Sequence, residues 1–208
     1  MELVIGSRQW SSWSLRAWLA LAHLGLEFRT NMIPLRQSES AQRIATVSPS
    51  GQVPVLIDDG GVIWDSLAIC EYANEHAGGR GWPQERAVRA HARAVSAEMH
   101  AGFAALRAAW PMEASTLGLQ VELPEQGVRD VARIEALIED CRDRYGARGP
   151  WLFGAWSIAD AMYAPVVLRF RSYGAALGTA ATTYSRTVLA DPVLATWLAA
   201  AGREMAAA

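Results

Sequence analysis

The first third of the chain alternates short apolar runs with longer stretches of helical periodicity. Four apolar runs bounded by turn residues predict β-strands: residues 3–6, 28–35, 53–58 and 62–64. Three stretches in which apolar residues recur every three or four positions predict helices: residues 14–24, 39–47 and 66–75. The sequence Asp59-Gly60-Gly61 is typical of a tight turn and joins the last two strands as a hairpin.

The predicted order is βαβ followed by ββα, which is the pattern of an α/β thioredoxin-like domain with a mixed four-stranded sheet. Residues 1–77 complete this pattern. A Gly-rich connector follows directly and has the sequence Ala77-Gly78-Gly79-Arg80-Gly81-Trp82-Pro83. We therefore place a domain boundary here, with a linker over residues 78–85.

Only helical patterns follow the connector. Apolar residues recur every three or four positions over 88–110 and over 128–145, which predicts two long antiparallel helices, each with one buried stripe. The loop 111–124 would join them. Residues 86–208 are therefore expected to form an all-α helical-bundle domain.

Two start signals predict the remaining helices. Ser157-Ile158-Ala159-Asp160 is a capping box that opens a helix through about residue 170. Asp191-Pro192 supplies an N-cap and a first helical residue for a last helix through about residue 205. The segment 172–189 has no recognisable pattern.

Composition narrows the classes of protein that this chain can be. A length of 208 residues with 51% hydrophobic residues supports a packed core, and a net charge of −2 provides no overall basic field for nucleic acid or anionic lipid. All 19 basic residues are arginine, which together with the abundant alanine indicates a coding bias more than phosphate recognition. The longest apolar stretch, 161–168, is too short to span a bilayer. We expect neither a nucleic-acid nor a membrane partner.

The cysteines and the N-terminus indicate the compartment. Cys70 and Cys141 lie far apart in apolar, helix-like contexts, so they form neither a CxxC redox pair nor a disulfide framework. No basic region followed by an apolar stretch marks a signal peptide. We expect a cytoplasmic protein without a bound metal, in which both cysteines are core residues.

Gln52-Val53-Pro54 places a proline at the start of a β run. Proline cannot donate to a strand ladder, so this segment should be a sheet edge or a bend. A cis Val53-Pro54 bond would turn the Val53 backbone N–H and C=O outward to pair with an extended peptide ligand. A trans proline that opens an edge strand is the commoner alternative, because only about 5% of X–Pro bonds are cis.

Two further stretches place polar groups at helix starts. Asp65 and Ser66 begin one helix, where Asp65 can accept from a ligand ammonium while the helix N–H groups bind a carboxylate; simple N-capping is the alternative. Ser11, Ser12 and Ser14 surround the start of the first helix, where hydroxyl and N–H groups can stabilise an anion such as a ligand thiolate. A capped helix with tryptophans as packing is the alternative there.

In their order and spacing, these stretches resemble the cytosolic glutathione S-transferases over the whole chain. Ser11-Ser12-Trp13-Ser14-Leu15-Arg16 is similar to the serine motif of the zeta and theta-like classes. Gln52-Val53-Pro54 resembles the cis-proline segment that pairs with the cysteinyl backbone of glutathione. Asp65-Ser66 resembles the pair that binds the γ-glutamyl group, and the residues 157–160 resemble the family's capping box. The resemblance implies a cis Val53-Pro54 bond and a homodimer.

The resemblance implies a detoxifying transferase with glutathione as co-substrate, which conjugates or reduces a hydrophobic electrophile or a peroxide. Ser11, in a zeta-like alignment, or Ser12, in a theta-like one, would donate to the glutathione sulfur; we favour Ser11. Arg16 would add positive potential near the thiolate or form a salt bridge. Trp13 stands where zeta enzymes have a cysteine, which argues against maleylacetoacetate isomerase activity.

The electrophile would bind between the domains, at the start of the first helix and along the long helix. Trp13, Met99, His100 and Phe103 are the candidates to contact it, with Trp110 and Tyr173 as further ones. The alternative functions are a glutathione-binding module without catalysis, a ligandin-like carrier of apolar compounds, and a maleylacetoacetate isomerase-type zeta enzyme.

Overall fold

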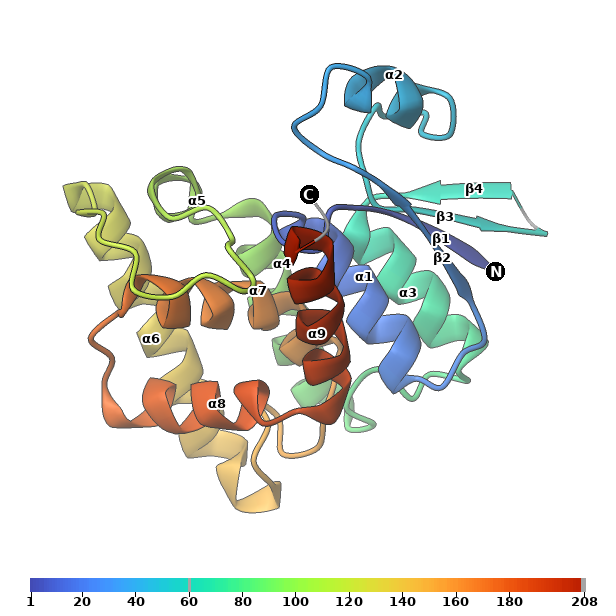
Figure 1. The fold of residues 1–208 in the computed structure, drawn as a ribbon. Helices are drawn as coiled ribbons and strands as arrows, with labels where there is room; N and C mark the ends of the chain where they lie inside the picture. The colour runs from blue at the N-terminus through green and yellow to red at the C-terminus, as the bar shows by residue number, and fades with distance from the viewer. Residues whose placement is uncertain (60, 207–208) are drawn as a thin grey trace.

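The structure is a computed structural model that describes residues 1–59 and 61–206 (Figure 1). The first domain contains the predicted βαβ-ββα order. Its strands are β1 (Glu2–Gly6), β2 (Arg29–Ile33), β3 (Val55–Asp58) and β4 (Gly61–Trp64). Its helices are α1 (Ser12–His23), α2 (Ser40–Ala45) and α3 (Ser66–His76). The strand order is β2-β1-β3-β4; β1 and β2 are parallel and the other pairs are antiparallel, which confirms the mixed four-stranded sheet.

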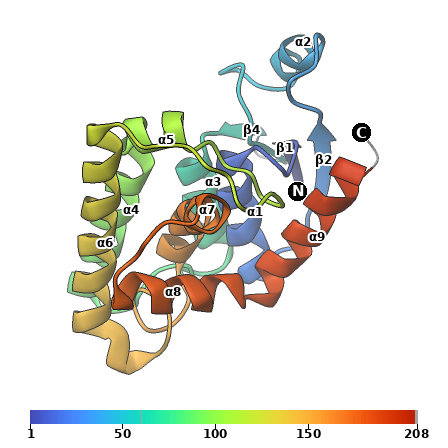
Figure 2. The ribbon, with the colours of Figure 1, turned by 60° about the vertical axis from the view of Figure 1, so that its left-hand side comes forward.

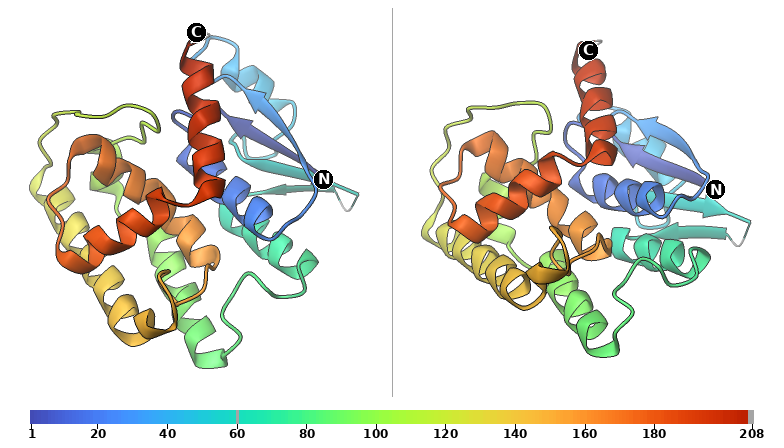
Figure 3. Two further views of the ribbon diagram at one scale, coloured as in Figure 1. Left: turned by 60° about the horizontal axis from the view of Figure 1, so that its bottom comes forward. Right: turned by 90° about the horizontal axis from the view of Figure 1, so that it is seen from below.

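Different helices cover the two faces of the sheet. Successive residues of a strand point to opposite faces, so neighbouring residues of β1 pack against different helices. Leu3 and Ile5 of β1 belong to the large core that includes α1 and α3. Val4 belongs to a small cluster with Ile44 of α2. Figure 3 shows α1 and α3 side by side on one face of the sheet. The N-terminal ends of both helices lie at one cavity, which is lined by Trp13 of α1 and by Asp65 and Ser66 at the start of α3.

The regular elements of the second domain are all helices within the described residues, apart from two isolated β-bridges at residues 151–155. Its helices are α4 (Arg86–Ala101), α5 (Ala104–Ala109), α6 (Glu125–Tyr145), α7 (Ile158–Tyr173), α8 (Thr179–Leu189) and α9 (Pro192–Ala206), with a 3₁₀ turn, η1, at Gly146–Arg148. Helix α7 passes through the middle of the molecule, between α1 on one side and α4 and α6 on the other (Figure 2). Every residue of α7 except Arg171 is buried. Within the residues that the structure describes, no helix is both long enough and apolar enough to cross a membrane.

The prediction of one long helix over 88–110 is wrong, because the chain breaks between α4 and α5. Gly102 is extended, with φ −98° and ψ −172°, and Phe103 is left-handed, with φ 63°. A side chain at Gly102 would place its Cβ 2.8 Å from the Glu98 carbonyl oxygen, so glycine permits this break. The next turn is held by Asp130, whose Oδ2 accepts from the Leu106 N–H at 3.0 Å. Phe103 and Leu106 remain buried after the break, so the apolar stripe continues through it.

Other element boundaries also differ from the prediction. Helix α8 lies in the segment for which no pattern was recognised; its buried face is narrow and consists of Ala181, Tyr184, Ser185 and Val188. Helix α7 extends through Tyr173 and ends at the left-handed Gly174. Strand β3 begins at Val55 because Pro54 precedes it, and the expected cis Val53-Pro54 bond is present.

The predicted capping box at the start of α7 is confirmed, and Asp160 is its centre. The Asp160 carboxylate accepts from the backbone N–H groups of Leu152 (3.1 Å) and Ser157 (2.8 Å), and from the Tyr184 hydroxyl (3.1 Å). Burial raises the pKa of this carboxyl to about 6. Since this pKa lies above the value in the unfolded chain, ionisation of Asp160 lowers the free energy of unfolding as the pH rises from about 4 to about 6. The hydrogen bonds of Asp160 connect α7, α8 and the turn before α7, and they offset the cost of burying this charge.

We predict that Asp160→Ala lowers the free energy of unfolding by about 3 kcal/mol at about pH 7, because four buried donors, including the Ser157 hydroxyl at 3.2 Å, would lose their acceptor. Urea denaturation followed by circular dichroism measures this change. The matched control is Asp140→Ala on α6, where the carboxylate is half-exposed and pairs with Arg144 at 3.2 Å. This control should change the free energy by less than about 1 kcal/mol. Equal effects of the two substitutions would contradict the role of Asp160.

Candidate functional site

A cavity of about 270 Å³ lies where α1, the segment before β3 and the start of α3 meet. It is lined by Trp13, Ser50, Gln52, Val53, Pro54, Trp64, Asp65 and Ser66. Six of these eight residues are candidates from the sequence. Ser50 and Trp64 were not predicted, although each lies next to a predicted motif in the chain. The structure therefore brings together three stretches that are far apart in the sequence.

Asp65 and Ser66 present polar groups at one end of this cavity. Asp65 is the N-cap of α3 in a left-handed conformation, with φ 73°. Its Oδ1 accepts from the N–H groups of Leu67 (2.8 Å) and Ala68 (3.2 Å). Ser66 is buried, and its Oγ has no hydrogen-bond partner within the described part of the chain. A buried hydroxyl without a partner is costly, so a ligand that bonds to it would be stabilised.

The serines at the start of α1 face inward and do not line the cavity. The Ser11 hydroxyl donates to Ser14 Oγ at 2.7 Å, and Ser14 Oγ also accepts from the Gly6 N–H at 3.1 Å. The Ser12 hydroxyl accepts from Arg169 Nη2 of α7 at 3.4 Å. Ser11 and Ser12 are each 6% exposed, and the wall of the cavity at this point is the side chain of Trp13.

Three arginine side chains gather behind Trp13. The guanidinium carbon of Arg16 lies 4.4 Å from the Trp13 ring centroid, and that of Arg107 lies 5.1 Å from it. Arg16 Nη2 donates to the Met99 carbonyl at 3.4 Å, whereas Arg16 Nε and Nη1 have no partner among the described residues. The third, Arg169, donates through Nε to the Trp110 carbonyl at 2.8 Å.

Burial of these arginines disfavours their charged form. Burial, followed by the nearby charges of Arg107 and Arg169, lowers the pKa of Arg16 well below its usual range, and the charge of Asp65 only partly opposes this. Burial, with Arg107 beside it, lowers the pKa of Arg169 to about 9. A buried positive cluster of this kind favours an anion next to Ser12.

The residues predicted to contact an electrophile do not all reach a cavity. Met99 and Phe103 are 2% and 9% exposed and pack in the core. Trp110 and Tyr173 are stacked on each other with ring centroids 5.1 Å apart, and both are buried. His100 is half-buried and lies edge-on to Trp13, with ring centroids 5.0 Å apart. Only Trp13 and His100 therefore lie at the cavity or next to it.

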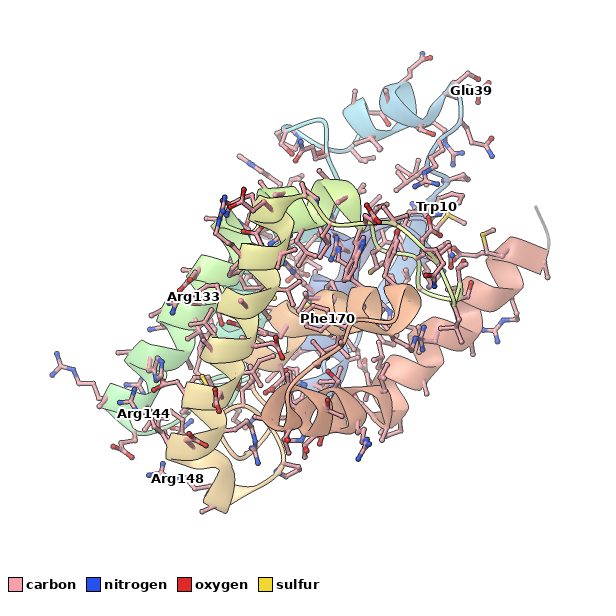
Figure 4. The ribbon with its side chains drawn as sticks, turned by 90° about the vertical axis from the view of Figure 1, so that its left-hand side faces the viewer. Trp10, Glu39, Arg133, Arg144, Arg148 and Phe170 are labelled. Atoms are coloured by element: carbon pink, nitrogen blue, oxygen red, sulfur yellow. The ribbon has the colours of Figure 1, made fainter. Side chains whose placement is uncertain are left out.

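A second cavity, of about 400 Å³, lies away from the space expected along the long helix. It lies between the loop after β1, the loop after β2 and the end of α9, and is lined by Ser7, Gln9, Trp10, Met32, Pro34, Leu35, Arg36, Gln37, Glu204 and Met205. Trp10, labelled in Figure 4, lies below α2 and near the end of α9. The walls of this second cavity are largely apolar.

The loop after β1 is fastened to the second domain. The Gln9 side-chain amide donates to Glu113 Oε2 (2.8 Å) and to Thr116 Oγ1 (3.0 Å), and its oxygen accepts from the Ser115 N–H (2.9 Å). Trp10 Nε1 also donates to Glu113 Oε2, at 3.2 Å. The segment 113–116 thus holds the two residues that precede the serines of α1.

One group of side chains has the composition of a metal site. His91, Asp140 and Cys141 place one potential ligand atom each within 4.8 Å of one another. Arg144 Nη1 lies 3.2 Å from Asp140 Oδ2 and 3.4 Å from His91 Nδ1, so a fixed positive charge already occupies this position. The group lies on α4 and α6 and lines neither cavity described above.

We predict that Arg16→Met raises the free energy of unfolding by about 1 to 2 kcal/mol, because it replaces a buried, incompletely bonded charge with an apolar side chain of similar length. Urea denaturation measures this change. The control, Arg133→Met on α6, removes a half-exposed partner of Glu98 and should change the free energy by less than about 1 kcal/mol. A large destabilisation by Arg16→Met would show that its charge has a counter-charge in the folded chain.

The chain is similar to glutathione S-transferases in sequence and in fold. Residues 10–76 match the family of glutathione S-transferase N-terminal domains. A curated Caenorhabditis elegans protein named "Probable maleylacetoacetate isomerase" is 37% identical over 93 residues. The matching part covers 44% of this chain and 42% of that protein, so less than half of the relative's length is spanned.

Solved structures extend the likeness to the whole fold. A glutathione transferase homolog from Burkholderia, solved with bound glutathione, is 23% identical over 94% of this chain and 95% of that chain, with a TM-score of 0.71. The Tau class glutathione S-transferase from mango is 19% identical over 100% and 98% of the two chains, with a TM-score of 0.69. A sphingomonad glutathione S-transferase complexed with glutathione is 18% identical over 97% and 99%, with a TM-score of 0.64. At these identities the likeness shows the fold alone.

Proposed function

Because this chain belongs to the glutathione S-transferase family, we propose that it is an enzyme that binds glutathione in the smaller cavity. It would hold glutathione as the thiolate and direct this thiolate at an apolar electrophile or a peroxide. The observation that supports this most directly is the meeting of the cis Val53-Pro54 segment, Asp65-Ser66 and the start of α1 at one cavity. Each provides a different kind of contact, and a tripeptide offers a matching group for each.

The two ends of the γ-glutamyl group would lie at the start of α3. Asp65 would bind the ammonium, and the Ser66 hydroxyl, which has no partner within the described residues, would bind the carboxylate together with helix N–H groups. Val53 precedes β3, and its backbone would pair with the cysteinyl backbone of glutathione. Gln52 lines the same cavity and would contact the peptide beside it.

Ser12 is the better candidate to donate to the sulfur, which reverses the preference for Ser11 from the sequence. The Ser11 hydroxyl proton is used in its bond to Ser14. Ser12 instead accepts from Arg169, so its own proton stays available for an anion. The positive cluster of Arg16, Arg107 and Arg169 would stabilise the thiolate, which is the nucleophilic form of a thiol.

The larger, apolar cavity would take the acceptor, because it is lined by residues of the loop that leads into α1. We further propose a cytoplasmic homodimer. Both cysteines are free and buried, which suits a reducing compartment. The edge strand β4 exposes Val62 and Trp64, which are 41% and 47% exposed and suit a partner surface.

We predict that binding lowers the thiol pKa of glutathione by about two units, equal to about 2.7 kcal/mol. Ultraviolet titration of the bound thiolate measures this shift. Ser12→Ala should reverse most of it, and Ser11→Ala, as the matched control, should reverse less. A bound thiol that ionises no earlier than free glutathione would contradict thiolate stabilisation. Retention on immobilised glutathione without turnover of any electrophile would favour the non-catalytic binding module instead.

We predict that Met205→Trp raises the KM for an apolar electrophile, such as a chlorodinitrobenzene, by about five-fold. The larger side chain would fill part of the larger cavity, and the electrophile would lose contacts worth about 1 kcal/mol. Met205 is 44% exposed, so the fold should be unaffected. The KM for glutathione should not change, and steady-state kinetics in both substrates measures the two values. Tight binding of hydrophobic dyes without any dependence on glutathione would favour the ligandin-like alternative.

A further inference from the structure

His100, near the end of α4, extends from the second domain to the polar end of the smaller cavity. Its Nε2 lies 3.2 Å from Asp65 Oδ2, so a residue of the helical domain contacts the carboxylate that caps α3 in the first domain. The imidazole is held in place by its edge-on contact with Trp13. This contact places a second titratable group against the expected binding position of an amino group.

The bonds of Asp65 leave little capacity for a ligand. A carboxylate offers about four acceptor positions, two on each oxygen. Both positions of Oδ1 are used by the N–H groups of Leu67 and Ala68. His100 uses one position of Oδ2, which leaves one position for an additional donor such as one N–H of an ammonium group.

The surroundings of His100 determine its charge. Its Nδ1 is buried and has no partner within the described part of the chain, so a proton there would be an unsatisfied donor. The charged groups that face it are Asp65 at the start of α3, Arg16 of α1 and Arg107 of α5. Burial lowers the pKa of His100; Asp65 acts in the opposite direction, and the two arginines lower it further. The imidazole is therefore neutral at neutral pH.

We propose that His100 is a positioning residue for the α-amino group of the ligand. As a neutral imidazole, His100 donates its Nε2–H to Asp65 and orients the free acceptor position of Oδ2. As an imidazolium, it cancels the negative charge of Asp65. This inference rests on the proposed glutathione function. In the neutral form, Asp65 keeps its full negative charge for the ammonium. In the protonated form, the ammonium meets a neutralised carboxylate next to a like charge, and its affinity falls.

The experiment compares two ligands at two pH values. S-methylglutathione has no titrating thiol, and its analogue without the α-amino group has nothing to bind to Asp65. Titration calorimetry at about pH 7.5 and about pH 5.5 spans the range in which a histidine titrates. The wild-type protein should bind S-methylglutathione about four-fold more weakly at the lower pH, a smaller loss than an ordinary histidine would give because burial lowers the pKa of His100. The affinity for the deamino analogue should change less than about two-fold.

His100→Gln tests the residue itself, because glutamine keeps an N–H donor and cannot ionise. Its affinity for S-methylglutathione at about pH 7.5 should stay within about two-fold of wild type, and the loss at about pH 5.5 should disappear. His91→Gln is the matched control on the same helix; His91 contacts Tyr145 and Phe153 and does not line the cavity. It should keep the wild-type pH dependence.

The outcomes separate this inference from the function on which it rests. An unchanged pH dependence in His100→Gln, or an equal pH dependence for the deamino analogue, would overturn the role of His100 and leave the glutathione site intact. No binding of S-methylglutathione by the wild-type protein at about pH 7.5 would overturn the proposed function and this inference together. Thermal melting of each variant confirms that it is folded.

Discussion

Burial of α1 on two sides is the constraint on which the rest of the structure depends. Helix α1 packs on the sheet and α3 within its own domain, and on α7 of the other domain. Helix α9 lies alongside it (Figure 3), where Trp18 and Trp197 have ring centroids 5.5 Å apart and His23 Nε2 lies 2.8 Å from Asp191 Oδ2. Because this one helix packs against elements of both domains within a single shared core, its polar first turn lies at the junction of the domains, and groups from both domains meet there.

This junction explains why the arginines behind Trp13 come from three different elements. Arg16 belongs to α1, Arg107 to α5 and Arg169 to α7, and their charges are buried together. Burial of unpaired charge destabilises a fold, and the large shared core offsets that cost. The same charges raise the positive potential at the start of α1, where the N–H groups of the first turn lack intrahelical partners. A feature that costs stability therefore coincides with the position where a thiolate would be stabilised.

The sequence predicts the order of elements well and their interruptions poorly. Alternating apolar runs, the Asp59-Gly60-Gly61 turn and the capping box at Asp160 are local signals, and each predicts a neighbouring element. The break before α5 does not interrupt the apolar pattern, because Met99 before it and Leu106 after it are both buried. The inward direction of Ser11 and Ser12 depends on Ser14 and on Arg169, and only the second domain supplies the latter. Contacts between distant segments therefore determine where the helix breaks and which way the two serines point.

The turn that leads into α1 separates the two cavities. Trp10 lines the larger one and Trp13 lines the smaller one, and Ser11 and Ser12 lie between them in the chain. The loop from residue 111 to 116 holds this turn from the other side: the Ala114 N–H donates to the Gln9 carbonyl at 3.0 Å, and Met112 and Ala114 are buried. With glutathione in the smaller cavity and an acceptor in the larger one, as proposed, the buried serines of this turn would lie between the thiol and the acceptor.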